Sequence, residues 1–211
     1  EMCIRDSVRT AALITNMDSP LGSAVGNSLE VIESVEILKG KTSGDLWTVC
    51  RELSCRMLML AGIGDKDECG RLVDEAVESG EALKRFEMMV KLQGGDVSYI
   101  EDTSKFRKAS FSREVYAPAD GYITHMDSEK IGLTAVLLGA GREKKDDDIN
   151  HAAGIIIAAK TGDFVKRGEL LATLLADDES RLDGAESRYL FAVSIGDKKP
   201  AEQPMILDYI D

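Results

Sequence analysis

The feature that most constrains the fold is a change of hydrophobic period near the middle of the chain. Before residue 98, apolar residues recur every three or four positions, as on one face of an amphipathic helix. After residue 111, the apolar runs are short and are separated by Gly, Pro and Asp, as in strands joined by turns. The polar segment between them, residues 98–111, is typical of a linker. The sequence therefore predicts two regions of different architecture.

The first region, residues 8–97, opens with a strand, a turn and a helix. Val8–Thr15 is apolar and rich in β-formers, which predicts a buried strand. The letters "NMDSPLG" supply turn formers, Asn27 or Ser28 is placed to cap a helix, and Gly40 is placed to end it. This order predicts an α/β unit. Three further helical patterns follow, over residues 46–60, 72–77 and 83–90.

The second region, residues 112–211, is predicted to be a β-rich, barrel-sandwich-like C-terminal domain of the α+β kind. Two short strands around Pro118 and Gly121 predict a hairpin-like pair. A short helix over residues 131–142 and two strands around a Gly-Asp turn follow, with a late strand expected at Tyr189–Ile195. The fold class is therefore α/β: a partial α/β domain followed by this β-rich domain.

The first seven residues, "EMCIRDS", do not fit either region. They show no periodicity and resemble the translation of a sequencing adapter. We expect residues 1–7 to be a non-native scar and the gene to be cut off upstream. A genuine but frayed start is the alternative.

Composition excludes several classes of function. The formal net charge is −12, and no cluster of Lys and Arg is free of nearby acids, which argues against a nucleic-acid partner. No apolar run approaches the roughly 20 residues that span a bilayer, so no membrane partner is expected. The spacings of the four cysteines match no zinc or redox pattern, and a cytoplasmic, reduced state is expected.

The turn before the first helix is the best candidate site. Pro20 and Gly22 are expected to bend the chain so that carbonyl oxygens point in one direction, and Glu33 follows on the helix. Carbonyls and one carboxylate suit a hard, weakly bound cation better than a transition metal. The alternative is a solvated glutamate among Glu30, Glu33 and Glu36.

Three other motifs give weaker evidence for a binding or catalytic site. The segment "KTGDFVKRGELLATL" is similar to half of a biotinyl or lipoyl carrier domain, but no lysine stands at the attachment position. Gly139, Gly141 and Arg142 could hold an oxyanion, or could simply end a helix. His125 and His151 stand in no spacing typical of a catalytic pair.

Four segments resemble the pyrimidine-nucleoside and thymidine phosphorylases. They are "ALITNMDSPLGSAVGNSLEVIESVEILKG", "SGEALKRFEMMVKLQGGD", "APADGYITHMDSEKIGLTAVLLGAGR" and "KTGDFVKRGELLAT", in the order in which the family carries them. The resemblance implies a cytoplasmic pentosyltransferase of nucleoside salvage that works as a homodimer. Its reaction is the reversible phosphorolysis of uridine or thymidine to free base and pentose 1-phosphate.

The resemblance also implies which parts of the site this chain carries. The family's Lys-His-Ser-Thr phosphate loop and its base-holding Arg, Ser and Lys belong upstream, so no catalytic residue and no organic cofactor site are assigned. We therefore expect a C-terminal fragment that is inactive alone. Some bacterial members bind potassium (K+), and the resemblance places its ligands at the carbonyls of Leu21 and Ala24 and the carboxylate of Glu33. It brings Arg142 toward the closed active site.

Two rival functions stay open from the sequence. One is a non-catalytic biotinyl- or lipoyl-like binding module, modified on Lys160 or Lys166. The other is a related phosphoribosyltransferase of similar architecture.

Overall fold

The computed structural model describes residues 9–142, 144–146 and 148–210. The expected scar at residues 1–7 lies outside the described residues. The chain divides into two compact units. Unit 1 comprises residues 1–16, 35–97 and 203–211, and unit 2 comprises residues 17–34 and 98–202. Each is described by itself.

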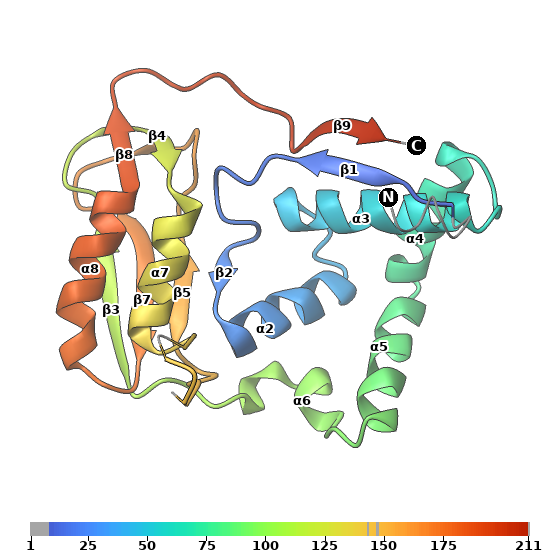
Figure 1. Cartoon of the computed structure of the whole chain (residues 1–211), viewed down its shortest axis with the longest axis horizontal. Coiled ribbons are helices and arrows are strands. Elements are labelled where there is room, and N and C mark those ends of the chain that lie inside the picture. The colour runs from blue at the N-terminus through green and yellow to red at the C-terminus, as the bar shows by residue number, and fades with distance from the viewer. Residues whose placement is uncertain (1–8, 143, 147, 211) are drawn as a thin grey trace. The chain divides into compact units, whose positions relative to one another are not determined.

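Unit 2 is built on two antiparallel sheets (Figure 1). The larger sheet has the strand order β2-β5-β7-β3 and the smaller has the order β6-β4-β8. The larger consists of β2 (Ala24–Val25), β5 (Gly154–Ile157), β7 (Leu170–Ala176) and β3 (Phe111–Tyr116). The smaller consists of β6 (Phe164–Val165), β4 (Gly121–Met126) and β8 (Val193–Gly196). Both sheets are open, and no closed barrel occurs among the described strands.

Two helices of unit 2 pack side by side on the larger sheet (Figure 1). They are α7 (Ser128–Leu138) and α8 (Ser180–Ala192). The Asp127 side chain caps α7 by accepting a hydrogen bond from the Lys130 amide, and Gly139 ends it with a φ of +109°. Tyr189 of α8 is fully buried between helix and sheet residues. Unit 2 therefore has one continuous apolar core. It also contains two short helical segments, α6 (Ser98–Glu101) and η1 (Thr103–Lys105).

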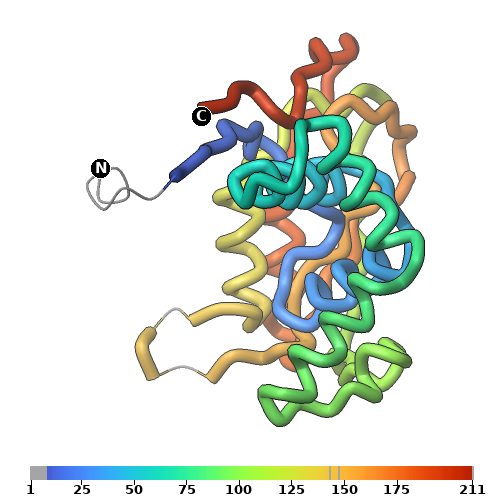
Figure 2. The backbone as a smooth tube through the Cα atoms, turned by 90° about the vertical axis from the view of Figure 1, so that its right-hand side faces the viewer, coloured from blue at the N-terminus to red at the C-terminus, as the bar shows by residue number. Residues whose placement is uncertain are grey.

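Unit 1 is mostly helical, with successive helices joined by short turns (Figure 2). Its helices are α3 (Gly44–Leu60), α4 (Lys66–Glu78) and α5 (Glu81–Leu92). Its strands β1 (Ala12–Thr15) and β9 (Ile206–Ile210) form an antiparallel pair. The helix α2 (Asn27–Leu38) is divided between the units after Ser34.

The predicted α/β class and the predicted helices are confirmed, and three details are wrong. β1 is not a buried strand, because Ala12 and Ile14 are exposed. β3 and β4 form no hairpin: β3 pairs with β7, whereas β4 pairs with β6 and β8. Most of the segment Tyr189–Ile195 is the end of α8, since the strand β8 begins only at Val193.

No helix among the described residues is long and apolar enough to cross a membrane.

Candidate functional site

The candidate site lies in unit 2, in the turn of residues 20–24 that leads into β2 and α2. Pro20, Gly22 and Ala24 are buried. Gly22 has a φ of +73°, and a Cβ atom added there would lie 2.5 Å from Oε2 of Glu33. Both the left-handed backbone and the closeness of the carboxylate therefore require glycine at this position.

Glu33 reaches back from α2 to the main chain of this turn. Its Oε1 accepts a hydrogen bond from the Ser23 amide at 2.7 Å, and its Oε2 accepts one from the Ala24 amide at 3.1 Å. A carboxylate that binds two successive amides fixes the turn more firmly than a solvated side chain can. Glu33 is thus a structural part of the turn, which the alternative of a solvated glutamate did not foresee.

The opposite side of the turn is bound by Lys160. The Lys160 ammonium donates hydrogen bonds to the carbonyl oxygens of Pro20 and Gly22, at 2.7 Å and 2.8 Å. The predicted convergence of carbonyls is therefore present, and a lysine ammonium lies on two of them. Nothing local in the sequence indicates this contact, since Lys160 stands 140 residues from Pro20.

The strand β2 determines how Ala24 is presented. Ala24 is opposite Ile156 of β5, and the amide of Ile157 donates to the carbonyl of Ser23 at 2.7 Å. The Ser23 carbonyl therefore faces β5, whereas the amides of Ser23 and Ala24 bind the carboxylate of Glu33.

The three predicted potassium ligands can be placed individually. The Ala24 amide donates a hydrogen bond to the carboxylate of Glu33, so these two residues are in direct contact. Leu21 lies in the same turn, between Pro20 and Gly22, whose carbonyl oxygens bind Lys160. Each carboxylate oxygen of Glu33 retains acceptor capacity beyond its one N–H bond. Main-chain oxygens and one carboxylate are a donor set suited to a hard cation of low charge. The residues present therefore fit such an ion. Among the described residues, no cluster of three or more His, Cys, Asp and Glu side chains is placed to hold a metal.

The start of α2 is anchored to the segment that follows α7. Asn27 and Ser28 were predicted to cap α2, but their side chains instead donate hydrogen bonds to the carbonyls of Ala140 and His151. The carboxylate of Glu30 binds the Gly26 amide at 2.9 Å. The helix that carries Glu33 is thus held at its beginning by contacts more than 100 residues away in the sequence.

The other predicted motifs either have a structural role or consist of exposed residues. Gly139 ends α7, which is the structural alternative for that motif, and the side chain of Arg142 is exposed. His125 is an exposed residue of β4, and His151 contributes its carbonyl to Ser28. Lys166 is exposed in the β6–β7 turn, whereas Lys160 is held by two carbonyls and is not presented as a carrier lysine would be.

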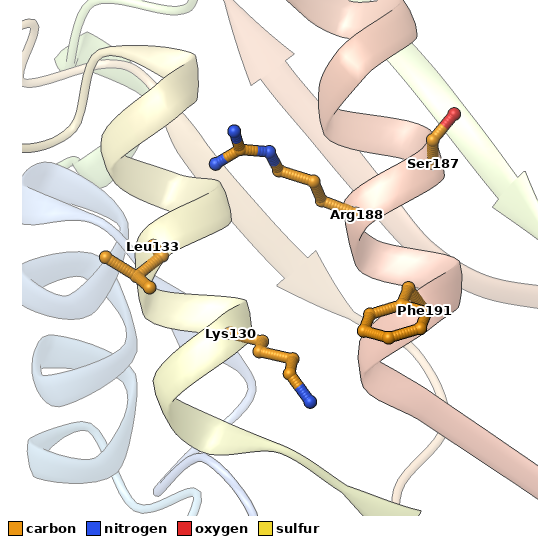
Figure 3. Close-up of a pocket in the computed structure, with 5 residues that line it drawn as sticks. All are labelled: Lys130, Leu133, Ser187, Arg188 and Phe191. Carbon is orange, nitrogen blue, oxygen red and sulfur yellow. The ribbon is translucent and has the colours of Figure 1, made fainter.

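A groove of about 330 Å³ between α7 and α8 is a second candidate (Figure 3). It is lined by Lys130, Leu133, Ser187, Arg188 and Phe191. Leu133 is 53% exposed and Phe191 is 77% exposed. Small-molecule sites enclose most of their ligand, so this open groove is the weaker candidate.

Residues 122–196 match the family described as "Pyrimidine nucleoside phosphorylase C-terminal domain". This segment runs from β4 to β8 and includes Lys160.

Similar curated proteins carry the same name. The chain is 40% identical over 173 residues to the pyrimidine-nucleoside phosphorylase of Bacillus subtilis (strain 168), covering 82% of this chain and 40% of that protein. It is 36% identical over 182 residues to that of Geobacillus stearothermophilus, covering 86% and 42%. It is 40% identical over 166 residues to that of Staphylococcus aureus (strain bovine RF122 / ET3-1), covering 78% and 38%. The chain thus spans about two fifths of the length of these relatives.

Proposed function

Since this chain belongs to the pyrimidine-nucleoside phosphorylase family and contains its C-terminal domain, we propose that it is part of an enzyme that cleaves pyrimidine nucleosides with phosphate. The products are the free base and a pentose 1-phosphate, and uridine and thymidine are the proposed substrates. The observation that carries the proposal is 40% identity over 173 residues to a pyrimidine-nucleoside phosphorylase.

The reaction is of the kind that electrostatic positioning accelerates. The glycosidic bond breaks with oxocarbenium character on the sugar, phosphate attacks the anomeric carbon, and negative charge develops on the departing pyrimidine. This chain's contribution is the turn of residues 20–24, held rigid by Glu33 through two amides. A potassium ion, when bound by Leu21, Ala24 and Glu33, would supply positive charge beside the phosphate loop that the family resemblance places upstream.

We further propose that the chain alone is inactive and that the whole enzyme is a cytoplasmic homodimer. The sequence contains no Lys-His-Ser-Thr loop to bind phosphate, and no residue of it is assigned to the base. The test is an assay of uracil or thymine release with uridine or thymidine and inorganic phosphate. The full-length enzyme should release base only with phosphate present, and the 211-residue chain should release none. Turnover by the chain alone would contradict the proposal.

The potassium site has its own test. Replacing Glu33 with Gln keeps the size of the side chain but removes the negative charge and one of the two oxygens that accept from the turn amides. The potassium concentration that half-activates the full-length enzyme should therefore rise about tenfold or more. Glu36→Gln is the matched control, because Glu36 lies on the same helix and pairs with Lys41. An unchanged potassium titration for Glu33→Gln would rule out this ligand.

A further inference from the structure

The turn of residues 20–24 is bound from two sides by oppositely charged side chains. On one side the Lys160 ammonium lies on two carbonyl oxygens, at 2.7 Å and 2.8 Å. On the other, the Glu33 carboxylate binds two amides, at 2.7 Å and 3.1 Å. Positive charge thus meets the carbonyl dipoles and negative charge meets the amide dipoles. Such charge-assisted hydrogen bonds are about twice as strong as neutral ones.

Lys160 is itself fixed in place by the segment that carries it. Its own amide donates to Oδ2 of Asp163 at 2.8 Å, which closes the turn after β5. The neighbouring Thr161 hydroxyl lies 2.7 Å from the Ser19 hydroxyl, a third hydrogen bond between the two turns. The main chain that carries the Lys160 ammonium to the carbonyls of Pro20 and Gly22 is therefore itself held by hydrogen bonds.

We propose that Lys160 is a positioning residue for the cation cradle. Two carbonyls that point at one place repel each other unless a cation lies between them, and the ammonium of Lys160 supplies that charge. With Glu33 on the amide side, Lys160 sets the direction of the intervening main chain, which includes Leu21. The inference rests on the proposed function only for the identity of the ion, because the clamp of Lys160 and Glu33 needs no bound ion.

The test measures amide hydrogen exchange of the 211-residue chain by NMR. In Lys160→Met, the carbonyls lose their cation, so the Ser23 and Ala24 amides should exchange about tenfold faster or more. Lys160→Arg should restore much of the protection, because a guanidinium also donates to two oxygens. Lys166→Met, which removes an exposed lysine of a nearby turn, should leave these amides unchanged.

The pattern of exchange separates positioning from general stability. If Lys160 only stabilised unit 2, the variant would speed exchange equally in the β5–β7 ladder, and that result would overturn the proposal. Unchanged protection of Ser23 and Ala24 would overturn it as well.

A measurement on the unmodified chain covers the case in which Lys160→Met does not fold. The ammonium protons of Lys160 should exchange with water at least about tenfold more slowly than those of Lys166. Equal rates would contradict the clamp. This measurement does not depend on the enzyme's reaction. If the potassium titration of Glu33→Gln is unchanged while the Lys160 ammonium protons exchange slowly, the potassium site is contradicted and the contact of Lys160 with the two carbonyls is still supported.

Discussion

The two units bury their apolar side chains to very different extents. Unit 2 has one continuous core, with Ile123, Met126 and Tyr189 fully buried. In unit 1, Met57 is 63% exposed and Leu92 is 81% exposed, and none of the described residues of α5 is buried. The helix α5 has an amphipathic pattern but no buried residue, whereas α3 and α4 each bury part of one face. The comparison teaches that the periodicity of a segment predicts a helix but does not reveal whether its apolar side is covered in this chain.

The largest expected effect tests the core of unit 2. Tyr189→Ala removes a ring that is 0% exposed, so it should lower the free energy of unfolding by about 3–5 kcal/mol. Denaturant unfolding followed by circular dichroism measures it. Phe191→Ala on the same helix is the control, and its effect should stay within about 0.5 kcal/mol because that ring is 77% exposed. Equal losses would show that α8 does not pack as described.

The next effect tests how closely the strands of unit 2 approach. Gly154 has a φ of +152°, and an added Cβ would lie 2.3 Å from the Val25 carbonyl oxygen. Gly154→Ala should therefore cost about 2–3 kcal/mol through strain and overpacking. Gly132→Ala in α7 meets no atom within 4 Å and should stabilise by about 1 kcal/mol. Thermal unfolding compares the two, and a neutral Gly154→Ala would show that β2 and β5 are not in contact there.

A smaller effect concerns Asp177, the carboxylate that directly follows strand β7 of unit 2. Arg107 and the Ser110 amide donate hydrogen bonds to Asp177 and lower its pKa from 3.8 to about 2. Because the folded pKa lies below the unfolded one, this stabilisation is present above about pH 5 and is lost as the pH falls toward 2. With allowance for solvent screening, it should be about 1 kcal/mol.

The measurement is urea unfolding of the chain and of Asp177→Asn between pH 7 and pH 2. The difference between the two proteins should shrink as the pH falls. Asp208→Asn, at an exposed position of β9, serves as the control. A difference that is constant with pH would mean that the ionised form of Asp177 is not the stabilising one.

The smallest effect on stability is expected in unit 1. Met57→Gln and Leu92→Gln change exposed side chains, so each should alter the free energy of unfolding by no more than about 0.5 kcal/mol. Because exposed apolar side chains promote association, the double variant should nonetheless self-associate less than the unmodified chain. Light scattering after size-exclusion chromatography tests this. Equal self-association of the double variant and the unmodified chain would mean that these two side chains do not contribute to an associating surface.

The contrast also explains how far the sequence could predict the fold. The pattern of apolar residues predicted α3, α4, α5 and α7, because helix formation is signalled locally. The turn chemistry around Gly121 predicted a hairpin, but local signals cannot say that β3 pairs with β7 across more than 50 residues. The predicted strand at Tyr189–Ile195 is correct only from Val193, because the residues before it end α8. Its helical spacing was present all the same, in Leu182, Ala185, Tyr189 and Ala192.

The candidate site likewise contains some features that the sequence could predict and others that it could not. Glu33 follows the turn closely in the sequence, so local spacing made it a candidate ligand, but its hydrogen bonds to the Ser23 and Ala24 amides were not predicted. The need for glycine at Gly22 could be inferred from a tight bend. The contact of Lys160 with Pro20 could not, since a tertiary contact over 140 residues leaves no local trace.

The pairing of β1 with β9 has a consequence for biosynthesis. Ala12 lies opposite Ile210, so the ribosome adds about 200 residues after β1 before its partner strand is complete. At about 5–20 residues per second, β1 waits on the order of 10–40 s for it. During that interval the edge of β1 that pairs with β9 lacks this partner, and an unpaired strand edge is a template for pairing with another chain.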